Sequence, residues 1–177
     1  MLPEEMAEYF VSIGEPKFRA KQTFQRLHRG EKIENITNLS KPLRERLIGE
    51  ILQTLPEVEE KLVSKIDGTV KYLFRLHDGA CIESVFMKYK HGNTICISTQ
   101  AGCRMGCAFC ASTLGGKVRD LTPSEMLGQV IAAQRDMGER ISGIVLMGIG
   151  EPLDNYDNVM KFLRLVGDEA GLNIGYR

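Results

Sequence analysis

The sequence lacks the features that mark membrane-spanning and secreted proteins. No apolar run approaches the roughly 20 residues that a helix needs to cross a bilayer. The first residues, MLPEEMAEYF, are acidic and lack the basic-then-apolar order of a signal peptide. Internal repeats and low-complexity tracts are absent as well. We therefore expect a globular, cytoplasmic protein with no membrane partner.

The chain also has no net charge, because 23 Lys and Arg residues balance 23 Asp and Glu residues. Taken alone, this balance argues against a nucleic-acid partner. The charge is unevenly placed, however, since nine basic and three acidic residues lie between Pro16 and Arg46. This basic segment is either an RNA-binding face or a solvated helix face, and both interpretations stay open. Its basic residues are Lys17, Arg19, Lys21, Arg26, Arg29, Lys32, Lys41, Arg44 and Arg46.

The sequence pattern changes twice along the chain and predicts an α/β protein with three regions. Residues 1–55 predict short helices, with apolar residues at helical spacing and Ser40 as the N-cap of KPLRERLIGEIL. Residues 56–92 predict antiparallel β-hairpins, because KLVSKI, VKYLFRL and CIESVFMK alternate between turn-forming Asp-Gly pairs. Residues 93–177 begin with the strand TICIST and predict a strand, helix, strand, helix order typical of parallel βα folds.

The strongest local signals lie in the last region. Thr122 to Glu125 form a capping-box pattern that predicts a helix running to about Gly138. The apolar segment ISGIVLM then predicts a strand, the glycine-rich GIGEPL a turn, and a second helix follows from about Asn155.

Three of the five cysteines stand within eight residues, at Cys103, Cys107 and Cys110. A structural zinc site uses four ligands, and the sequence offers no second CxxC pair and no histidine nearer than His91. Three thiolates at this spacing suit a [4Fe–4S] cluster with one iron left open. The loop also follows a predicted strand, and βα folds place active sites at such carboxyl ends. The alternative is a set of buried structural thiols.

The motif CxxxCxxC with Phe109 before the last cysteine resembles the signature of the radical S-adenosylmethionine (radical SAM) superfamily. In that superfamily a Gly-Glu-Pro motif after the second barrel strand binds the amino group of S-adenosylmethionine. Gly150 and Glu151, followed by Pro152, stand after ISGIVLMGI, where this motif belongs. Without the cysteines, these three residues would indicate only a turn.

Four stretches, FRAKQTFQRLH, TNLSKPLRERL, STQAGCRMGCAFCAS and LMGIGEPLDNYDNV, are similar to the RlmN/Cfr group of this superfamily. The resemblance implies the N-terminal portion of a radical SAM (β/α)6 partial barrel, preceded by a small helical domain and antiparallel β-hairpins. On this view residues 1–55 are an RNA-binding accessory domain, residues 56–92 a hairpin connector and residues 93–177 the first part of the barrel.

The resemblance also implies roles for individual residues. Cys103, Cys107 and Cys110 would bind the [4Fe–4S] cluster, and Gly150 and Glu151 would contact S-adenosylmethionine. Two further residues match by their offsets from the first cluster cysteine, Cys96 as the cysteine that resolves the covalent enzyme–RNA intermediate and Glu83 as the general base. From the residues alone, Cys96 is equally a small buried hydrophobe and Glu83 a solvated strand residue.

The activity implied is methylation of carbon 2 of an adenine in 23S ribosomal RNA, with transfer RNA as a second substrate in some members. Carbon 2 and carbon 8 of adenine cannot attack a methyl sulfonium as nucleophiles, so radical chemistry is required. By the same resemblance, a cysteine near the C-terminus would carry the methyl group, Cys96 would form a disulfide with it on product release, and a flavodoxin system would supply electrons. No cysteine follows Cys110 here, so we expect the N-terminal part of such an enzyme or a truncated product.

Three other functions stay open from the sequence. One is a Cfr-type enzyme that methylates carbon 8 rather than carbon 2. Another is a different radical SAM enzyme, which leaves FRAKQTFQRLH and the offsets of Glu83 and Cys96 without explanation. The last is an inactive RNA-binding fragment.

Overall fold

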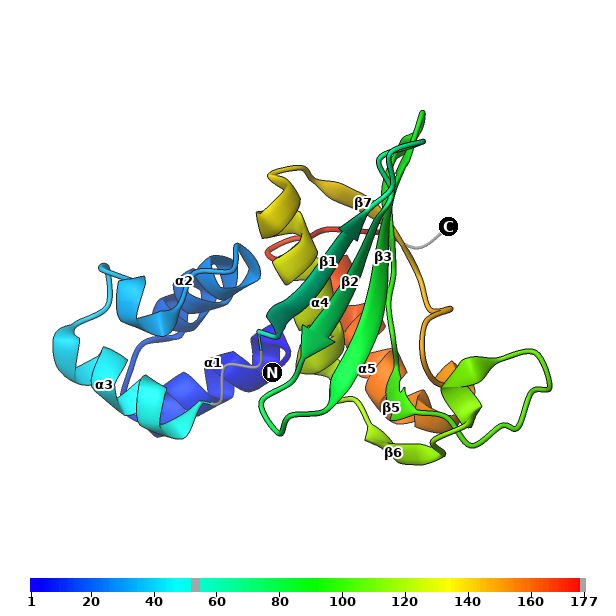
Figure 1. Cartoon of the computed structure of the whole chain (residues 1–177). Helices are drawn as coiled ribbons and strands as arrows, with labels where there is room; N and C mark the ends of the chain where they lie inside the picture. Colours follow the sequence, from blue (N-terminus) through cyan, green and yellow to red (C-terminus); the bar gives the residue numbers. More distant parts are fainter. Residues whose placement is uncertain (52–54, 176–177) are drawn as a thin grey trace. The chain divides into compact units, whose positions relative to one another are not determined.

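The computed structural model describes residues 1–51 and 55–175, which fall into two compact units. One unit comprises residues 1–51 and 163–175, and the other residues 55–162. Each unit is described separately below, with the elements labelled as in Figure 1. None of the helices in the described part of the chain has the length and apolar character needed to cross a membrane.

The N-terminal part of the first unit is helical, as the spacing of its apolar residues predicted. They are α1 (Pro3–Ser12), α2 (Lys17–His28), the short 3-10 helix η1 (Ile33–Asn35) and α3 (Lys41–Glu50). Ser40 is the N-cap of α3, and its side chain accepts a hydrogen bond from the backbone of Leu43, so this expectation is confirmed. Apolar residues from all four elements bury one another in a common core, among them Phe10, Phe24, Ile33 and Leu47.

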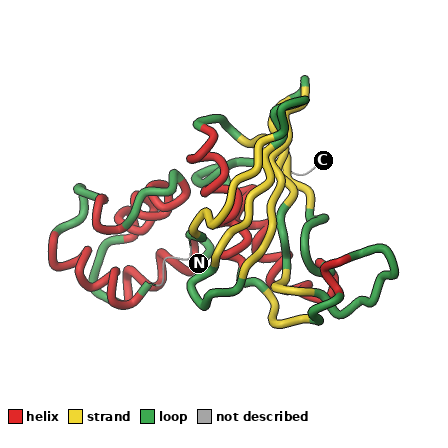
Figure 2. Tube along the Cα trace, in the orientation of Figure 1, coloured by secondary structure: helices red, strands yellow, loops and turns green. Residues whose placement is uncertain are grey.

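The second unit is built on a five-stranded mixed sheet (Figure 2). Its strands, in spatial order, are β1 (Glu57–Val63), β2 (Val70–Arg75), β3 (Cys81–Tyr89), β4 (Gly92–Cys96) and β7 (Ile141–Val145). The first four pair as antiparallel neighbours, and β7 lies parallel to β4. The hairpins and the start of the βα segment therefore share one sheet, an α/β arrangement that agrees with the expected fold class.

The helix α4 (Pro123–Met137) covers one face of this sheet (Figure 1). Thr122 and Glu125 make the predicted capping box, and Gly138 ends the helix in the left-handed conformation. Side-chain hydrogen bonds join helix and sheet: Tyr72 donates to the partly exposed Asp136 (2.6 Å), and the buried Ser84 donates to Gln129 (2.8 Å).

The remaining elements follow β4 and β7 along the chain and contain or adjoin the predicted cofactor motifs. They are the two-stranded ribbon of β5 (Gln100–Gly102) and β6 (Lys117–Asp120), the 3-10 helices η2 (Ala111–Thr113) and η3 (Pro152–Asn155), and α5 (Tyr156–Gly167). The pattern predicted the start of α5 to within a residue, but it did not predict the ribbon. The strand expected to run to Thr99 ends at Cys96, because the chain turns there to begin β5.

Candidate active site

The two predicted cofactor motifs emerge at the same edge of the sheet. Because β4 and β7 are parallel, their carboxyl ends lie side by side. The segment after β4, residues 97–120, contains the three clustered cysteines, and the segment after β7, residues 146–155, contains Gly150 and Glu151. The fold therefore places both motifs where βα proteins bind ligands.

Backbone hydrogen bonds hold the segment after β7 against the segment after β4. The N–H of Ile149 donates to Ser98 Oγ (3.0 Å), and its carbonyl accepts from the N–H of Thr99 (2.9 Å). One residue earlier, the N–H of Gly148 donates to the carbonyl of Ile97 (3.1 Å). The glycine-rich turn is therefore an ordered extension of the sheet.

Two glycines in this turn are required by close packing. A Cβ atom on Gly148 would lie 2.7 Å from the carbonyl carbon of Ile97, and one on Gly150 would lie 2.6 Å from Cβ of Gln100. Gly150 also has a φ of +106°, a conformation that residues with side chains rarely adopt. No larger residue fits either position without moving the neighbouring strand extension.

Glu151 is fixed through both its backbone and its side chain. Its N–H donates to Gln100 Oε1 (3.0 Å), and its own Oε1 accepts from the N–H of Leu153 (3.0 Å), which caps η3. The side chain is half-buried. The predicted contacts to S-adenosylmethionine therefore lie in a turn whose backbone geometry is set before any ligand binds.

The cysteine loop is fastened mainly at its ends. Gly102 has a φ of +73°, and a Cβ atom on it would lie 2.0 Å from the carbonyl oxygen of Gly116. The same carbonyl accepts from the N–H of Cys103 (3.0 Å), so the two ends of the loop meet. Within the loop, the N–H of Gly106 donates to Thr113 Oγ1 (2.9 Å).

All five cysteines are free, so the structure does not support a disulfide within the chain. Cys103 is buried, Cys107 is exposed and Cys110 is half-buried. In the parts of the chain that the structure describes, no three Cys, His, Asp or Glu side chains are arranged to hold a metal ion. The structure thus brings the three cysteines into one loop but does not bring their thiols to a common point.

The donors themselves fit an iron–sulfur cluster. Three thiols with no other covalent partner stand on one short loop, and soft thiolates are the ligands that such clusters use. Hydrogen bonds from the side chain and backbone of Ser112 lower the pKa of the Cys110 thiol, which favours its thiolate form.

The register of the sheet brings Glu83 and Cys96 together on one face. Cys96 lies directly opposite Val85 across the β3–β4 pair, and Glu83 is two residues before Val85 on β3. Side chains two apart on a strand point to the same face. Glu83 and Cys96 are therefore diagonal neighbours, a relation that places residues roughly 7–8 Å apart. They occupy the face opposite to Ser84, whose side chain contacts α4.

The surroundings of these two residues differ. Glu83 Oε1 lies 2.7 Å from Lys71 Nζ on β2, and both side chains are nearly half-exposed. Burial raises the pKa of the Cys96 thiol, and the backbone of Met147 acts weakly in the opposite direction. Cys96 is therefore protonated at neutral pH.

Two buried amides that the sequence interpretation did not single out support this edge. Gln129 of α4 accepts from the N–H of Ser98 (2.9 Å) and donates to its carbonyl (3.0 Å). Asn155 donates to the carbonyls of Thr99 and Leu121 (both 2.8 Å). The only sequence signals were a polar residue in an otherwise apolar helix face and the position of Asn155 just after the Gly-Glu-Pro turn.

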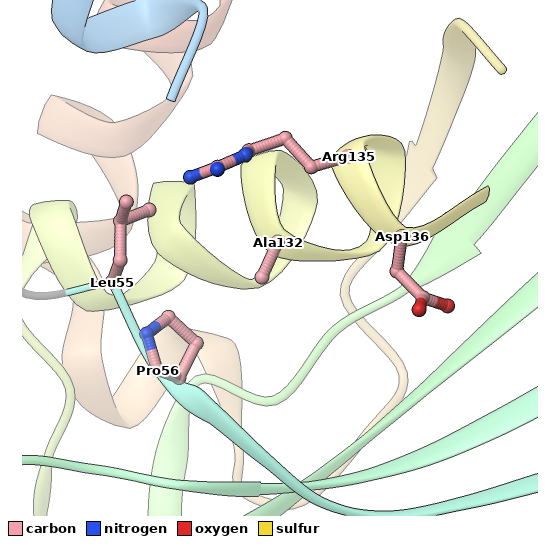
Figure 3. A pocket seen from close by; sticks show the side chains of 5 residues that line it. All are labelled: Leu55, Pro56, Ala132, Arg135 and Asp136. Atoms are coloured by element: carbon pink, nitrogen blue, oxygen red, sulfur yellow. The ribbon is translucent and has the colours of Figure 1, made fainter. Parts of the chain in front are cut away.

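A cavity of about 330 Å³ lies beside the C-terminal half of α4 (Figure 3). It is lined by Leu55, Pro56, Ala132, Arg135 and Asp136. None of these lining residues belongs to the predicted site. The cavity is therefore separate from the cysteine loop and the glycine-rich turn.

Two family models match the chain. Residues 1–51 match the ribosomal RNA large subunit methyltransferase N-terminal domain, and residues 97–177 match the radical SAM superfamily. These ranges contain the N-terminal helices and both cofactor motifs respectively.

Curated relatives and a solved structure match nearly the whole chain. A probable dual-specificity RNA methyltransferase RlmN from Alkaliphilus metalliredigens is 61% identical over 175 residues, and one from Clostridium acetobutylicum is 56% identical over 174. Each match covers 98% of this chain and 50% of the relative. The crystal structure of a radical SAM methyltransferase from Sphaerobacter thermophilus is 37% identical with a TM-score of 0.91, covering 99% of this chain and 53% of that one. The chain thus spans about half the length of the proteins it matches.

Proposed function

Because this chain belongs to the RlmN-type radical SAM methyltransferases, we propose that it is the N-terminal portion of an enzyme that methylates carbon 2 of an adenine in 23S ribosomal RNA. Its relatives are named probable dual-specificity RNA methyltransferases, which supports a second RNA substrate, and the family resemblance makes transfer RNA the candidate. A substrate of this kind also implies a cytoplasmic enzyme.

Cys103, Cys107 and Cys110 would hold a [4Fe–4S] cluster, as their free thiols and shared loop allow. Gly150 and Glu151 would contact S-adenosylmethionine from the turn that faces the same sheet edge. When bound, the cluster supplies the electron that cleaves S-adenosylmethionine, and a flavodoxin system would reduce it. The protein's own contribution is to hold the two binding segments at a fixed separation.

Glu83 would remove the proton from carbon 2 of the adenine, since it is the carboxylate on the open face beside Cys96. Cys96 would then release the product by attacking the sulfur of the cysteine that carries the methyl-derived carbon. The sulfur–carbon bond breaks, its electron pair stays with the carbon, and that carbon takes a proton to become the methyl group. The resulting disulfide joins Cys96 to a cysteine that this chain does not contain.

The basic segment between Pro16 and Arg46 would contact RNA phosphates. Four of its nine basic residues pair with glutamates, namely Arg26, Lys32, Lys41 and Arg46. Their partners are on the same surface, so the net positive charge rests chiefly on the other basic residues of the segment. Such phosphate contacts position RNA without reading its sequence.

One observation carries the proposal: the register places Glu83 and Cys96 on one face of the sheet, and β4 leads from that face into the cysteine loop. Any radical SAM protein requires the cluster loop, whereas a resolving cysteine and a general base would also have to lie close together, as Glu83 and Cys96 do. A Cfr-type enzyme that acts on carbon 8 would use the same pair, so the products separate the two.

Anaerobic reconstitution with iron and sulfide tests whether the cysteine loop holds an iron–sulfur cluster. The wild-type chain should gain the broad visible absorbance typical of iron–sulfur clusters, and alanine at Cys103, Cys107 or Cys110 should abolish it. Cys96→Ala and, as a matched control, Cys81→Ala should retain the wild-type iron content. A wild-type chain that takes up no iron would instead favour an RNA-binding fragment, and iron loss in Cys96→Ala would make Cys96 a ligand.

A further inference from the structure

We infer that Asp154 is a positioning residue that ties the turn carrying Gly150 and Glu151 to the cysteine loop. The inference rests on the proposed function, because these two segments are the proposed contacts to S-adenosylmethionine and to the cluster. It assigns to one carboxylate the ionic link between the turn and the cysteine loop, in addition to the hydrogen bonds described above.

Asp154 stands in η3, three residues after Glu151, and its side chain is only 14% exposed. Three side chains approach its carboxylate. Gln100 Nε2 donates to Oδ2 (2.9 Å), Lys117 Nζ lies at the same distance from Oδ2, and the guanidinium of Arg104 donates to Oδ1. Together these donors keep the pKa of Asp154 well below its usual range, so the carboxylate is charged at neutral pH.

The three donors come from three parts of the segment after β4. Gln100 begins β5, Lys117 begins β6, and Arg104 directly follows Cys103 inside the loop. Asp154 therefore contacts the strand that enters the cysteine loop, the strand that leaves it and the loop itself. A single carboxylate on η3 thus connects the turn after β7 to both ends of the cysteine loop.

Gln100 extends the connection to Glu151. Its side chain is fully buried, and its amide donates both to Asp154 and to Asp120 (2.8 Å). The carbonyl oxygen of the same amide accepts from the N–H of Glu151 (3.0 Å). The orientation of the amide is thereby fixed, because only carboxylates can accept from its nitrogen and only an N–H can donate to its oxygen.

The contacts of Asp154 with Gln100 and Lys117 should contribute more than its contact with Arg104, because they are less exposed to solvent. Arg104 is 66% exposed, and an ion pair to such a side chain contributes little by itself. The bonds from Gln100 and Lys117 are shielded from solvent and are made to a charged acceptor, which is the stronger class of hydrogen bond. We therefore expect the charge of Asp154 to matter more than its contact with Arg104.

The isosteric variant Asp154→Asn removes the charge and places an amide among cationic donors. Its matched control is Asp136→Asn, because Asp136 likewise accepts from a neutral donor, Tyr72 (2.6 Å), and from a lysine, Lys61. Asp136 lies on α4 and contacts none of the proposed site residues. Both variants should have melting temperatures within a few degrees of each other. A difference between them in S-adenosylmethionine binding would therefore come from the position of Asp154 beside the proposed site, not from a general loss of stability.

The experiment uses the anaerobically reconstituted chain, with the cluster reduced and S-adenosylmethionine added in steps. The readouts are iron content and the change that the ligand causes in the electron paramagnetic resonance spectrum. Asp154→Asn should keep its iron and require about tenfold more S-adenosylmethionine for half of the change. Asp136→Asn should follow the wild-type titration, and Arg104→Met should shift it in the same direction by less.

Wild-type titration curves for both Asp154→Asn and Arg104→Met would overturn the inference. If Asp154→Asn fails to fold or to hold iron, Arg104→Met decides alone, since this exposed side chain can be removed without opening the core. A wild-type chain that binds no cluster would refute the proposed function instead. The inference would then be tested on the metal-free chain by hydrogen exchange of the Glu151 amide. Faster exchange in Asp154→Asn than in Asp136→Asn supports it, and equal exchange overturns it.

Discussion

The two segments that leave the carboxyl edge of the sheet are held in different ways. The turn after β7 is bonded to the neighbouring strand extension at successive residues, and its glycines leave no room for a side chain. The cysteine loop is fastened at its ends, while Phe109 and Leu114 within it are 94% and 86% exposed. The difference indicates that the fold itself sets the shape of the turn, whereas the loop would take its final form only around the proposed cluster.

The largest expected effect comes from filling the space at the turn. Gly148→Ala would press a methyl group against the backbone of Ile97 and Ser98, which cannot move aside without breaking the strand extension. We expect the free energy of unfolding to fall by about 3 kcal/mol, measured by urea denaturation. Gly115→Ala in the cysteine loop meets no atom within 4 Å and should change stability by less than about 0.5 kcal/mol. If both variants lowered the free energy of unfolding equally, the turn would not be more tightly packed than the cysteine loop.

Removing the buried side-chain amide of Gln100, which lies between the two segments, should lower the free energy of unfolding by less than Gly148→Ala does. Gln100→Leu leaves the N–H of Glu151 without its acceptor and takes one donor from each of two carboxylates, which should lower the free energy of unfolding by about 2 kcal/mol. Gln134→Leu is the matched control, since Gln134 accepts one bond from the N–H of Ile141 (3.1 Å) and should cost about 1 kcal/mol. Urea denaturation of both variants measures the difference, and a larger loss in the control would contradict the account.

Thiol reactivity should distinguish the loop from the sheet at about the tenfold level. Iodoacetamide should modify the exposed Cys107 at least about tenfold faster than Cys96 at pH 7.5, because burial raises the pKa of the Cys96 thiol. A raised pKa means that the thiolate forms only at higher pH, so the rate at Cys96 should still be climbing above pH 9. Peptide mass spectrometry gives both rates, and the contrast should vanish in urea. A faster rate at Cys96 in the folded chain would show that its thiol is not shielded.

The smallest effect is expected on the open face of the sheet. Lys71→Met removes the partner of Glu83, but both side chains are nearly half-exposed, so the loss should stay below about 1 kcal/mol. The same urea experiment in high salt should reduce the difference further. A loss as large as that of Gln100→Leu would show that this ion pair is part of the scaffold.

Local signals in the sequence were enough for most of the elements. The capping box from Thr122 to Glu125, the N-cap Ser40 and the Asp-Gly turns each act within a few residues, and the structure has all of them. β1 was placed less well, because it starts at Glu57 in a run of charged residues where alternation gives no signal. The bounds of β1 follow from its antiparallel pairing with β2, which runs from Glu57 opposite Arg75 to Val63 opposite Val70.

The connections between segments could not be read from the sequence. The ribbon of β5 and β6 joins residues on either side of the cysteine loop, and each strand is too short to have a period of its own. The carboxylate of Asp154 meets donors that precede it by 37 to 54 residues. The offsets that singled out Glu83 and Cys96 came from a family resemblance, and the β3–β4 register supplied the reason that they are neighbours.

The central claim is that Glu83 removes the proton and Cys96 releases the product. It can be tested in a protein with the full length of the relatives, where both Glu83→Gln and Cys96→Ala should trap a covalent protein–RNA adduct. In the Cys96→Ala adduct, the adenine has already lost the hydrogen at carbon 2. In the Glu83→Gln adduct, the adenine still carries that hydrogen.

The decisive measurement is mass spectrometry of the two adducts formed with RNA that carries deuterium at carbon 2 of the target adenine. We expect the Glu83→Gln adduct to keep the deuterium and the Cys96→Ala adduct to have lost it. Equal loss of deuterium from both adducts, or normal turnover by Glu83→Gln, would contradict the account.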